Sequence, residues 1–250
     1  MRKILLITGA SAGIGAATAR KAARAGYDIA LNYHSNIDGA KAVMAEAQSA
    51  GARVILCPGD VADPEAIADI FARIDKEFGR LDALVNNAGV VDTVASVTDF
   101  THARLRRMFD INVIGAMLIA KEAVVRMQKQ GPEQGQRGAI VNTSSIAARL
   151  GSGHTFVDYA ASKAAIDTFT KGLSDEVAPD GIRVNAVRPG IIETDIHAKA
   201  GAPERVEQIT PSIPLRRSGH ADEVADAILY LLSDQASYIT GTTLDVSGGR

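Results

Sequence analysis

Short apolar runs alternate with longer segments of helical periodicity along almost the whole of the 250-residue chain. The runs have the length of strands, and the segments between them repeat apolar residues at the spacing of one helix face. Strands are expected at 3–8, 28–33, 53–57, 82–86, 138–143, 182–187 and 243–246, and helices at 13–25, 38–50, 64–78, 101–129, 158–178 and 221–233. This alternation predicts a mostly parallel seven-stranded sheet with helices on both faces. Right-handed crossovers then give one Rossmann-type, doubly wound α/β domain over residues 1–250.

The composition argues against several kinds of partner. Hydrophobic residues make up 46% of the chain and the net charge is −2, so the chain lacks the basic surplus of a nucleic-acid binder. No apolar stretch approaches the length of a membrane span, and the five histidines show no metal-ligand spacing. Cys57 is the only cysteine, which excludes an intramolecular disulfide and favours a reducing, cytoplasmic location. We therefore expect a small-molecule substrate and no metal, membrane or nucleic acid.

A glycine-rich loop, Thr8-Gly9-Ala10-Ser11-Ala12-Gly13-Ile14-Gly15, joins the first expected strand to the first expected helix. Glycines permit a tight turn and let the backbone come close to a ligand. The helix that follows offers free N–H groups and a partial positive charge to a pyrophosphate. The spacing is Gly-x-x-x-Gly-x-Gly, and its place between a strand and a helix predicts nucleotide binding. The contacts expected from this loop are Gly9, Ser11, Ala12, Gly13, Ile14 and Gly15.

The end of the second strand bears on which nucleotide binds. Folds of this kind that prefer NAD usually place an acid there to bond the ribose 2′-hydroxyl, but residues 29–36 contain none. A carboxylate would repel a 2′-phosphate, so its absence favours NADP, with NAD as the alternative. No Arg or Lys stands at 33–36, and an ordinary polar turn is the competing interpretation. Side chains that could donate hydrogen bonds to the phosphate are Asn32, His34, Ser35 and Asn36, and the contacts expected here are Tyr33, His34 and Ser35.

Tyr159 and Lys163 stand four residues apart within the expected helix 158–178. Positions i and i+4 share a helix face, so the phenol and the ammonium would point into the same space. The lysine charge favours the phenolate and would lower the tyrosine pKa from its usual value of about 10. Such a pair can exchange a proton with an alcohol or carbonyl oxygen. The same spacing also occurs by chance on solvated helices, so the interpretation depends on the other motifs.

Those motifs appear in a characteristic order: the glycine loop, Asn86-Asn87-Ala88-Gly89, Asn112, Ser144-Ser145, Tyr159 with Lys163, and Pro189-Gly190. Together they resemble the short-chain dehydrogenase/reductase family, and the resemblance covers the whole chain. The closing Asp245-Val246-Ser247-Gly248-Gly249 is similar to the end of bacterial ketoacyl-carrier-protein reductases and glucose dehydrogenases of that family. The resemblance also implies a homotetramer, in which helices 101–129 and 158–178 pair across one interface.

The resemblance implies four catalytic residues. Tyr159 would be the general acid/base, and Lys163 would lower its pKa and bond the nicotinamide ribose. Ser145 would orient the substrate oxygen, with Ser144 as the alternative for this role. Asn112 would hold a water that connects Lys163 to solvent.

The resemblance also implies nucleotide contacts outside the glycine loop. Asp60 would contact the adenine, with Val61 beside it. The remaining expected contacts are Asn87, Ala88, Gly89, Tyr159, Lys163, Pro189, Gly190, Ile192 and Thr194.

The function predicted from the sequence is that of an NADP-dependent oxidoreductase, which interconverts a carbonyl and an alcohol by hydride transfer. A family member that catalyses epimerisation or dehydration is one alternative, and a catalytically silent nucleotide-binding regulator is another. Residues 190–220 carry several Gly and Pro and break the alternation, which predicts a substrate lid. The segment Arg149–Val157 is expected to extend the pocket wall. The substrate and the direction of reaction are not predicted, because a fold does not choose among carbonyl compounds.

Overall fold

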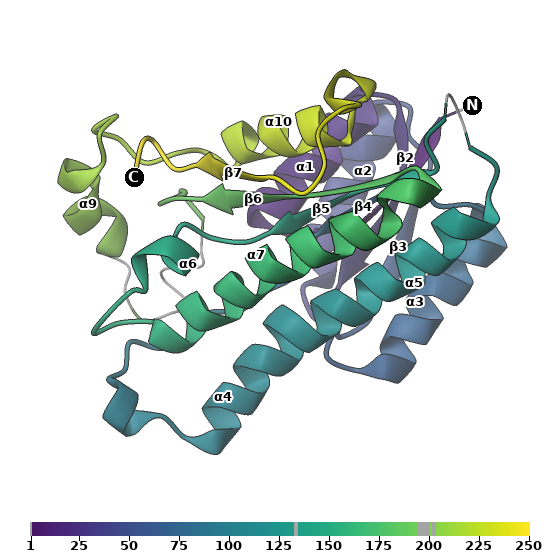
Figure 1. Cartoon of the computed structure of the whole chain (residues 1–250). Coiled ribbons are helices and arrows are strands. Elements are labelled where there is room, and N and C mark those ends of the chain that lie inside the picture. The colour runs from purple at the N-terminus through teal and green to yellow at the C-terminus, as the bar shows by residue number, and fades with distance from the viewer. Residues whose placement is uncertain (1, 133–134, 195–200, 202–203) are drawn as a thin grey trace.

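Seven parallel strands form one sheet through the middle of the protein (Figure 1). The structure, a computed structural model, describes residues 2–132, 135–194, 201 and 204–250. The strand order is β3-β2-β1-β4-β5-β6-β7, and every neighbouring pair is parallel. The strands are β1 (Lys3–Ile7), β2 (Tyr27–Tyr33), β3 (Val54–Pro58), β4 (Ala83–Asn86), β5 (Gly138–Thr143), β6 (Ile182–Pro189) and β7 (Thr243–Val246). The predicted single doubly wound α/β domain is confirmed.

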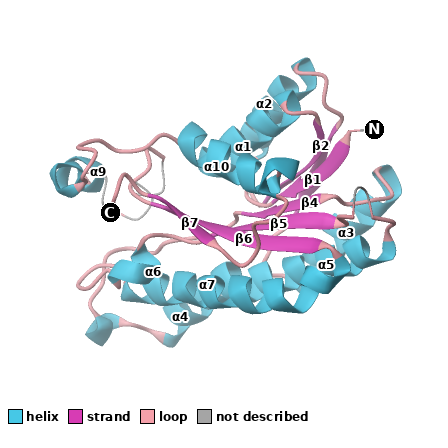
Figure 2. Ribbon diagram, turned by 45° about the horizontal axis from the view of Figure 1, so that its top comes forward, coloured by secondary structure: helices cyan, strands magenta, loops and turns pink. Residues whose placement is uncertain are grey.

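Helices cover both faces of the sheet (Figure 2). One face carries α1 (Gly13–Arg24), α2 (Ile37–Ser49) and α10 (Ala221–Leu232). The other carries α3 (Pro64–Glu77), α4 (His102–Phe109), α5 (Ala116–Lys129) and α7 (Val157–Val177). Two short helices, α6 (Ala147–Leu150) and α9 (Arg205–Ile209), lie beyond the ends of the strands.

Each face of the sheet has its own apolar core. In β1, Leu5 and Ile7 belong to the core beneath α1 and α10, whereas Ile4 and Leu6 belong to the core beneath α3 and α5. This division follows from the two-residue period of a strand, which sends successive side chains to opposite faces. Because most strand residues are buried on both faces, the strands are mostly apolar, and this explains why the sequence shows short apolar runs.

One predicted helix is interrupted in the structure. Residues 101–129 were expected to form a single helix, but a π-helical turn, Asp110–Gly115, separates α4 from α5. The backbone stays helical across the junction, so the apolar pattern gives no sign of the change. A Cβ at Gly115 would collide with the carbonyl oxygen of Val61, so glycine allows the turn to lie directly against the loop after β3. Such turns often occur at functional sites, and Asn112 lies in this one.

The predicted lid, 190–220, is anchored at both ends. Ile192 forms a parallel bridge with Gly219, and the Gly219 N–H donates to the carbonyl oxygen of Ile191 at 2.9 Å. Near the far end the Ile213 side chain is buried. Residues 195–200 and 202–203 of the predicted lid lie outside the described residues, as do 133–134 of the polar loop before β5. Within the described ranges, no helix is long and apolar enough to cross a membrane.

Candidate active site

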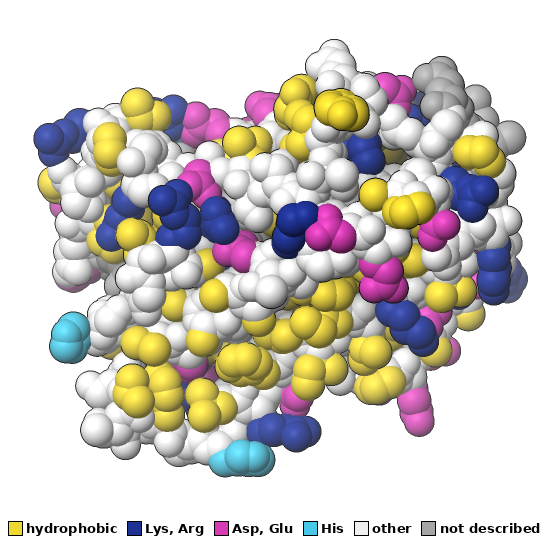
Figure 3. Space-filling view, in the orientation of Figure 1, with side chains coloured by type: hydrophobic (Ala, Val, Ile, Leu, Met, Phe, Trp, Pro, Cys, Tyr) yellow, Lys and Arg dark blue, Asp and Glu magenta, His cyan; other side chains and the backbone are white. Residues whose placement is uncertain are grey.

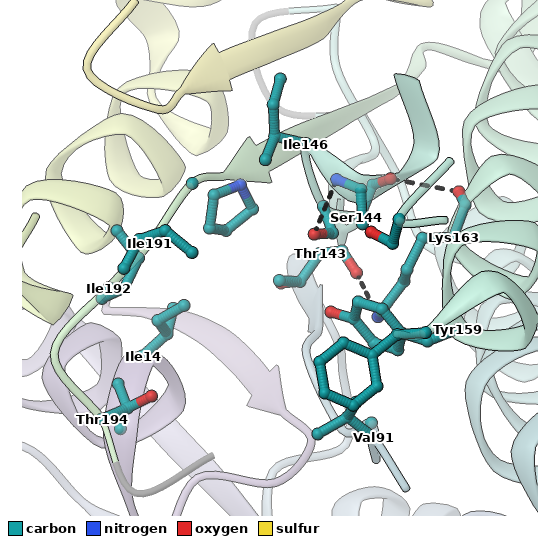
Figure 4. Close-up of a pocket in the computed structure, with 18 of the residues that line it drawn as sticks. Ile14, Val91, Thr143, Ser144, Ile146, Tyr159, Lys163, Ile191, Ile192 and Thr194 are labelled. Atoms are coloured by element: carbon teal, nitrogen blue, oxygen red, sulfur yellow. Dashed lines mark hydrogen bonds between the residues drawn. The ribbon is translucent and has the colours of Figure 1, made fainter. Parts of the chain in front are cut away.

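A cavity of about 620 Å³ opens where the parallel strands end. This is the edge at which doubly wound sheets place their ligands. Most residues predicted to bind the nucleotide or to catalyse line it: Gly9, Ser11, Ala12, Gly13, Ile14, Asn87, Ala88, Gly89, Ser145, Tyr159, Lys163, Pro189, Gly190, Ile192 and Thr194. Figure 4 shows Tyr159 and Lys163 on one side of this space, with Ile14 and Ile192 opposite.

The glycine loop fits a phosphate-bearing ligand. Gly9 and Gly13 have φ values of 63° and 55°, a left-handed conformation that favours glycine. A Cβ at Gly15 would lie 2.5 Å from the carbonyl oxygen of Gly9, so Gly15 permits close packing of α1 on the loop although it does not line the cavity. Ala12 gives α1 no side-chain cap, and the first turn holds no acid. The free N–H groups at the start of α1 are therefore suited to bind an anion.

Asn87 fixes the loop against the end of β4. Its side-chain amide donates to the carbonyl oxygen of Thr8 at 2.9 Å. The Thr8 hydroxyl in turn accepts hydrogen bonds from the N–H groups of Asn87 and Ala88, both at 2.9 Å. These bonds join the ends of β1 and β4, so the phosphate-facing loop and the next wall of the cavity form one rigid unit.

Ser144 and Ser145 follow β5 but point to different neighbours. The Ser144 hydroxyl donates to the main-chain carbonyl oxygen of Lys163 at 3.1 Å and is buried against α7. The Ser145 hydroxyl accepts from the N–H of Ala147 at 3.1 Å and forms a hydrogen bond with the Tyr159 side chain. Of the two serines proposed from the sequence, Ser145 is thus the one whose hydroxyl meets the tyrosine.

Lys163 lies at the base of the cavity. Its Nζ donates to the carbonyl oxygen of Thr143 at 2.8 Å and lies 5.7 Å from the centroid of the Tyr159 ring (Figure 4). Burial lowers the pKa of Lys163 to about 8, and the carboxylate of Asp167 opposes this shift. The i, i+4 spacing therefore brings the two side chains onto one face of α7, as predicted.

The pKa of Tyr159 differs from the sequence-based expectation. Lysine was expected to lower it, but in the ligand-free protein burial raises the pKa of the Tyr159 hydroxyl, and the hydrogen bond with Ser145 lowers it only in part. Desolvation disfavours the charged phenolate, and the Lys163 ammonium is held by the Thr143 carbonyl. Tyr159 is therefore a neutral phenol at neutral pH in this state.

Asn112 lies behind this pair and does not line the cavity. Its amide accepts from the N–H of Val90 at 2.8 Å and donates to the Val90 carbonyl at 2.9 Å and to the Ser162 hydroxyl at 3.1 Å. A Cβ on Gly89 would lie 3.2 Å from Asn112 Oδ1 and 3.3 Å from Lys163 Nζ. The π-helical turn thus places the Asn112 side chain next to Gly89, the same glycine that the Lys163 ammonium approaches.

The nucleotide contacts predicted at and after the ends of β2 and β3 lie outside the cavity: Tyr33, His34, Ser35, Asp60 and Val61. His34 and Ser35 are exposed, and His34 Nε2 lies 3.9 Å from Asp60 Oδ2.

Three residues at this end are engaged within the protein. Tyr33 is only 7% exposed. Asn32 is not free to bind a phosphate, because its amide donates to the carbonyls of Cys57 and Gly59 and accepts from the N–H of Gly9. Asn36 caps α2 through the N–H of Gly39.

The loop from α6 to α7 forms the far wall of the cavity, as predicted for residues 149–157. The non-glycine residues Ser152 and His154 have φ values of 50° and 62°, next to Gly151 at 73°. Such left-handed residues are strained and are often found at ligand sites. The lining residues of this loop are Leu150, Ser152, Gly153, Thr155 and Phe156.

Sequence reasoning missed another set of lining residues: Val91, Thr143, Ile146, Ala147, Ile191 and Arg250. Most of them lie at a strand end or in the loop after one, a position that could have suggested them. Arg250 had no such signal. No group of side chains in the described ranges is arranged to hold a metal ion.

Known proteins share this arrangement. A protein-family model described as enoyl-(acyl carrier protein) reductase matches residues 9–250. The uncharacterized oxidoreductase YgfF of Escherichia coli is 49% identical over 99% of both chains. The L-rhamnose 1-dehydrogenase (NAD(P)(+)) of a Sphingomonas species is 37% identical over 99% of this chain and 95% of its own. The crystal structure of a short chain dehydrogenase from Burkholderia cenocepacia in complex with NADP has a TM-score of 0.90 and 34% identity, over 99% of this chain and 97% of that one. The chain therefore belongs to the short-chain dehydrogenase/reductase family of oxidoreductases, as its motifs had indicated.

Proposed function

We propose that this protein is an NADP-dependent oxidoreductase that interconverts a carbonyl and an alcohol, with Tyr159 as the general acid/base. The observation that carries the proposal is the meeting of the Ser145 and Tyr159 hydroxyls on the wall of a cavity that also contains the glycine loop. Proton donors placed at an oxygen where charge develops lower the barrier to its reduction.

The side chains divide the chemistry between them. The Ser145 hydroxyl would hydrogen-bond the substrate oxygen and hold it beside Tyr159. Because burial keeps the Tyr159 phenol protonated, its Oη–H is suited to give a proton to a carbonyl oxygen. In the reverse direction the tyrosine would take that proton from the alcohol. Lys163 would place a positive charge beside the phenol and restore its proton, with Asn112 behind it.

A nicotinamide nucleotide would supply or accept the hydride when bound. The glycine loop and the start of α1 would hold its phosphates, as argued from their free N–H groups. Pro189, Gly190, Ile192 and Thr194 line the cavity from the end of β6 and would border the nicotinamide. The end of β2 holds no carboxylate, which favours NADP. The similar Burkholderia protein was crystallised with NADP, and the name of the rhamnose dehydrogenase allows both nucleotides.

Three further features belong to the proposal. Figure 3 shows hydrophobic side chains gathered over the face formed by α4, α5 and α7, and Ile114 on this face is 48% exposed, which suits the predicted homotetramer.

A reducing cytoplasm remains the expected location, because the only cysteine is buried and unpaired. Closure of the predicted lid, 190–220, over the substrate also remains a proposal; its described ends are held by the bridge between Ile192 and Gly219 and by the buried side chain of Ile213.

A turnover assay tests the proposal. NADPH and NADH oxidation would be followed by absorbance with a panel of ketones, keto acids, sugars and acyl thioesters, with the corresponding alcohols in the reverse direction. We expect at least one carbonyl to be reduced with a preference for NADPH. Nucleotide binding without oxidation on any carbonyl would favour the silent regulator, and conversion of a substrate without net oxidation of the nucleotide would favour epimerisation or dehydration.

A further inference from the structure

Arg250 brings a free positive charge to the wall of the cavity. Its side chain is half-buried. In the part of the chain that the structure describes, its guanidinium forms no hydrogen bond and no ion pair; only its main-chain oxygen is engaged, by the Ser247 hydroxyl at 3.0 Å. Nothing in the proposed chemistry uses this residue.

The backbone before Arg250 is fixed in place. Gly248 and Gly249 have φ values of 68° and 93°, and Cβ atoms there would lie 2.8 Å from Ile213 and 3.1 Å from Pro214. The Leu215 N–H donates to the carbonyl oxygen of Gly248 at 3.1 Å. Two left-handed glycines therefore turn the chain back against the 213–215 segment and toward the cavity, so the position of Arg250 does not depend on a loose tail.

The location of this turn separates Arg250 from the adenosine end. Ser247 packs on Gly190, where a Cβ would lie 2.7 Å from Ser247 Cα, and both follow the neighbouring strands β6 and β7. In the sheet order, β7 is at the opposite edge from β2 and β3, which end near the expected 2′-phosphate. Figures 1 and 2 place the end of the chain between α6 and α9, and Arg250 lines the same cavity as the strained loop that forms its far wall.

The side-chain charges of the wall favour an anion at this end. Among its described lining residues are two cations, Lys163 and Arg250, and no Asp or Glu. Lys163 is engaged with Thr143 and Tyr159. The rest of the far wall is apolar or carries hydroxyl groups, for example Leu150, Phe156 and Thr155. Arg250 is therefore the one described group on that wall that can pair with a substrate anion.

We propose that the substrate is a carbonyl or alcohol compound with an anionic group, a carboxylate or a phosphate, which Arg250 binds. This deepens the proposed function and rests on it. The reaction is unchanged: the carbonyl carbon would take the hydride that a bound reduced nicotinamide nucleotide supplies, the oxygen would take its proton from Tyr159, and the anionic group would stay intact at the other end of the molecule. A guanidinium binds carboxylates and phosphates through two parallel hydrogen bonds, which would also fix the distance from anion to carbonyl.

Matched pairs of acids and esters test this inference. The probes are pyruvate, acetoacetate and levulinate, each beside its methyl ester, because the series varies the distance from carbonyl to carboxylate while each pair differs mainly in charge. Hydroxyacetone phosphate beside hydroxyacetone distinguishes phosphate from carboxylate. We expect a kcat/KM for at least one anion about tenfold or more above that of its neutral partner. In Arg250→Gln this ratio should fall close to one, and Arg250→Lys should restore part of it.

Arg149→Gln is the matched control, because it removes a charge from α6 that pairs with Asp245 and does not line the cavity. It should keep the anion preference. Equal rates for acid and ester at every chain length, or an unchanged ratio in Arg250→Gln, would overturn the inference. A fall in NADPH affinity as large as the fall in kcat/KM would also overturn it, since Arg250 would then bind the cofactor.

Binding without turnover separates this inference from the proposed function. Titration calorimetry of the same acids and esters into protein saturated with NADP⁺ needs no reaction. Binding of an acid that weakens about tenfold or more in Arg250→Gln would support the anion site even if no carbonyl is reduced. Turnover of neutral carbonyls, with no effect of Arg250 on binding or rate, would leave the proposed function standing and reject the anion site.

Discussion

Asp158, the residue before Tyr159, accepts a 2.6 Å hydrogen bond from Nε of Arg104. The Asp158 side chain is fully buried and that of Arg104 is 10% exposed, so the pair is withdrawn from solvent. The second carboxylate oxygen of Asp158 accepts from the N–H of Tyr159 at 2.9 Å. One buried ion pair therefore ties α4 to the first turn of α7, at the residue that carries the proposed proton donor.

Breaking this pair should weaken the fold. Arg104→Met leaves a buried carboxylate without its partner, and we expect the free energy of unfolding to fall by about 3 kcal/mol. The double variant Arg104→Met/Asp158→Asn should lose less than the sum of the single changes, because no charge is then left unpaired. Chemical denaturation measures all three. The control is Arg53→Met, whose partner Glu77 is exposed and whose loss should cost under about 1 kcal/mol. If Arg104→Met lowers the free energy of unfolding by no more than Arg53→Met does, burial does not strengthen the pair of Arg104 and Asp158.

Tyr159→Phe should retain the fold and nucleotide binding while nearly abolishing turnover. The ring still packs, but the hydroxyl that meets Ser145 is lost. We expect kcat to fall by about a hundredfold or more. Tyr238→Phe is the control, because Tyr238 is fully exposed and lies outside the cavity lining. If Tyr159→Phe keeps kcat within about tenfold of the unaltered protein, another group must deliver the proton.

Lys163 should make stability depend on pH. The free energy of unfolding of the ligand-free protein, taken relative to that of a variant without the lysine, should be lower at neutral pH than at alkaline pH. Its pKa is lowered from 10.5 to about 8, so between these values the unfolded chain binds one more proton than the folded one. The stability of the unaltered protein relative to Lys163→Met should therefore be constant below pH 8 and rise by about 3 kcal/mol as the pH increases to 10.5.

Denaturation of both proteins at about pH 7 and about pH 10 measures this difference. Other groups that titrate in this range are common to both proteins and cancel. Lys171→Met, an exposed lysine on the same helix, controls for the loss of a positive charge from α7. If the difference in stability between the two proteins is the same at both pH values, the lysine keeps its ordinary affinity for protons in the cavity.

Ser35 offers a test of the nucleotide preference, because it is exposed at the end of β2 where Tyr33 is buried. Ser35→Asp should weaken NADP binding by roughly tenfold through repulsion of the 2′-phosphate and leave NAD binding almost unchanged. Ser35→Arg should have the opposite effect on NADP. The enhancement of NADPH and NADH fluorescence on binding gives the six dissociation constants of the unaltered protein and the two variants. If Ser35→Asp changes the binding of both nucleotides equally, the ribose that carries the 2′-phosphate does not lie next to Ser35.

Much of the fold follows from local pattern. Strands buried on both faces must be apolar, so the seven runs were visible, and their observed ends differ from the predicted ones by at most two residues. Glycines and polar residues after these runs pointed to the cavity, because parallel strands bring their ends to one edge. The spacing of Tyr159 and Lys163 on one helix predicted that they share a face, but the meeting of Ser145, which follows β5, with Tyr159 of α7 could be predicted only from the resemblance.

The remainder depends on contacts that no local pattern records. Asn32 was interpreted as a phosphate donor, but it bonds loops from β1 and β3 that lie beside it only in the folded sheet. Arg250 reaches the cavity through a turn whose two glycines fit against residues more than thirty positions earlier in the sequence. The rise in the Tyr159 pKa was missed because the charge of Lys163 was visible in the sequence and the burial was not.

The π-helical turn between α4 and α5 also sets the rotational phase of two helices. A π turn adds one residue without ending the helix, which rotates everything after it by about 100° relative to an uninterrupted α-helix. This offset lets α4 face α7 through Arg104 while α5 directs Ile119 and Ala123 into the sheet core. Deletion of a single residue from Asp110–Gly115 would keep this phase but remove the turn that holds Asn112, whereas insertion of one residue would turn the apolar stripe of α5 away from the core. Length in this segment is therefore constrained more tightly than the identity of most residues in it.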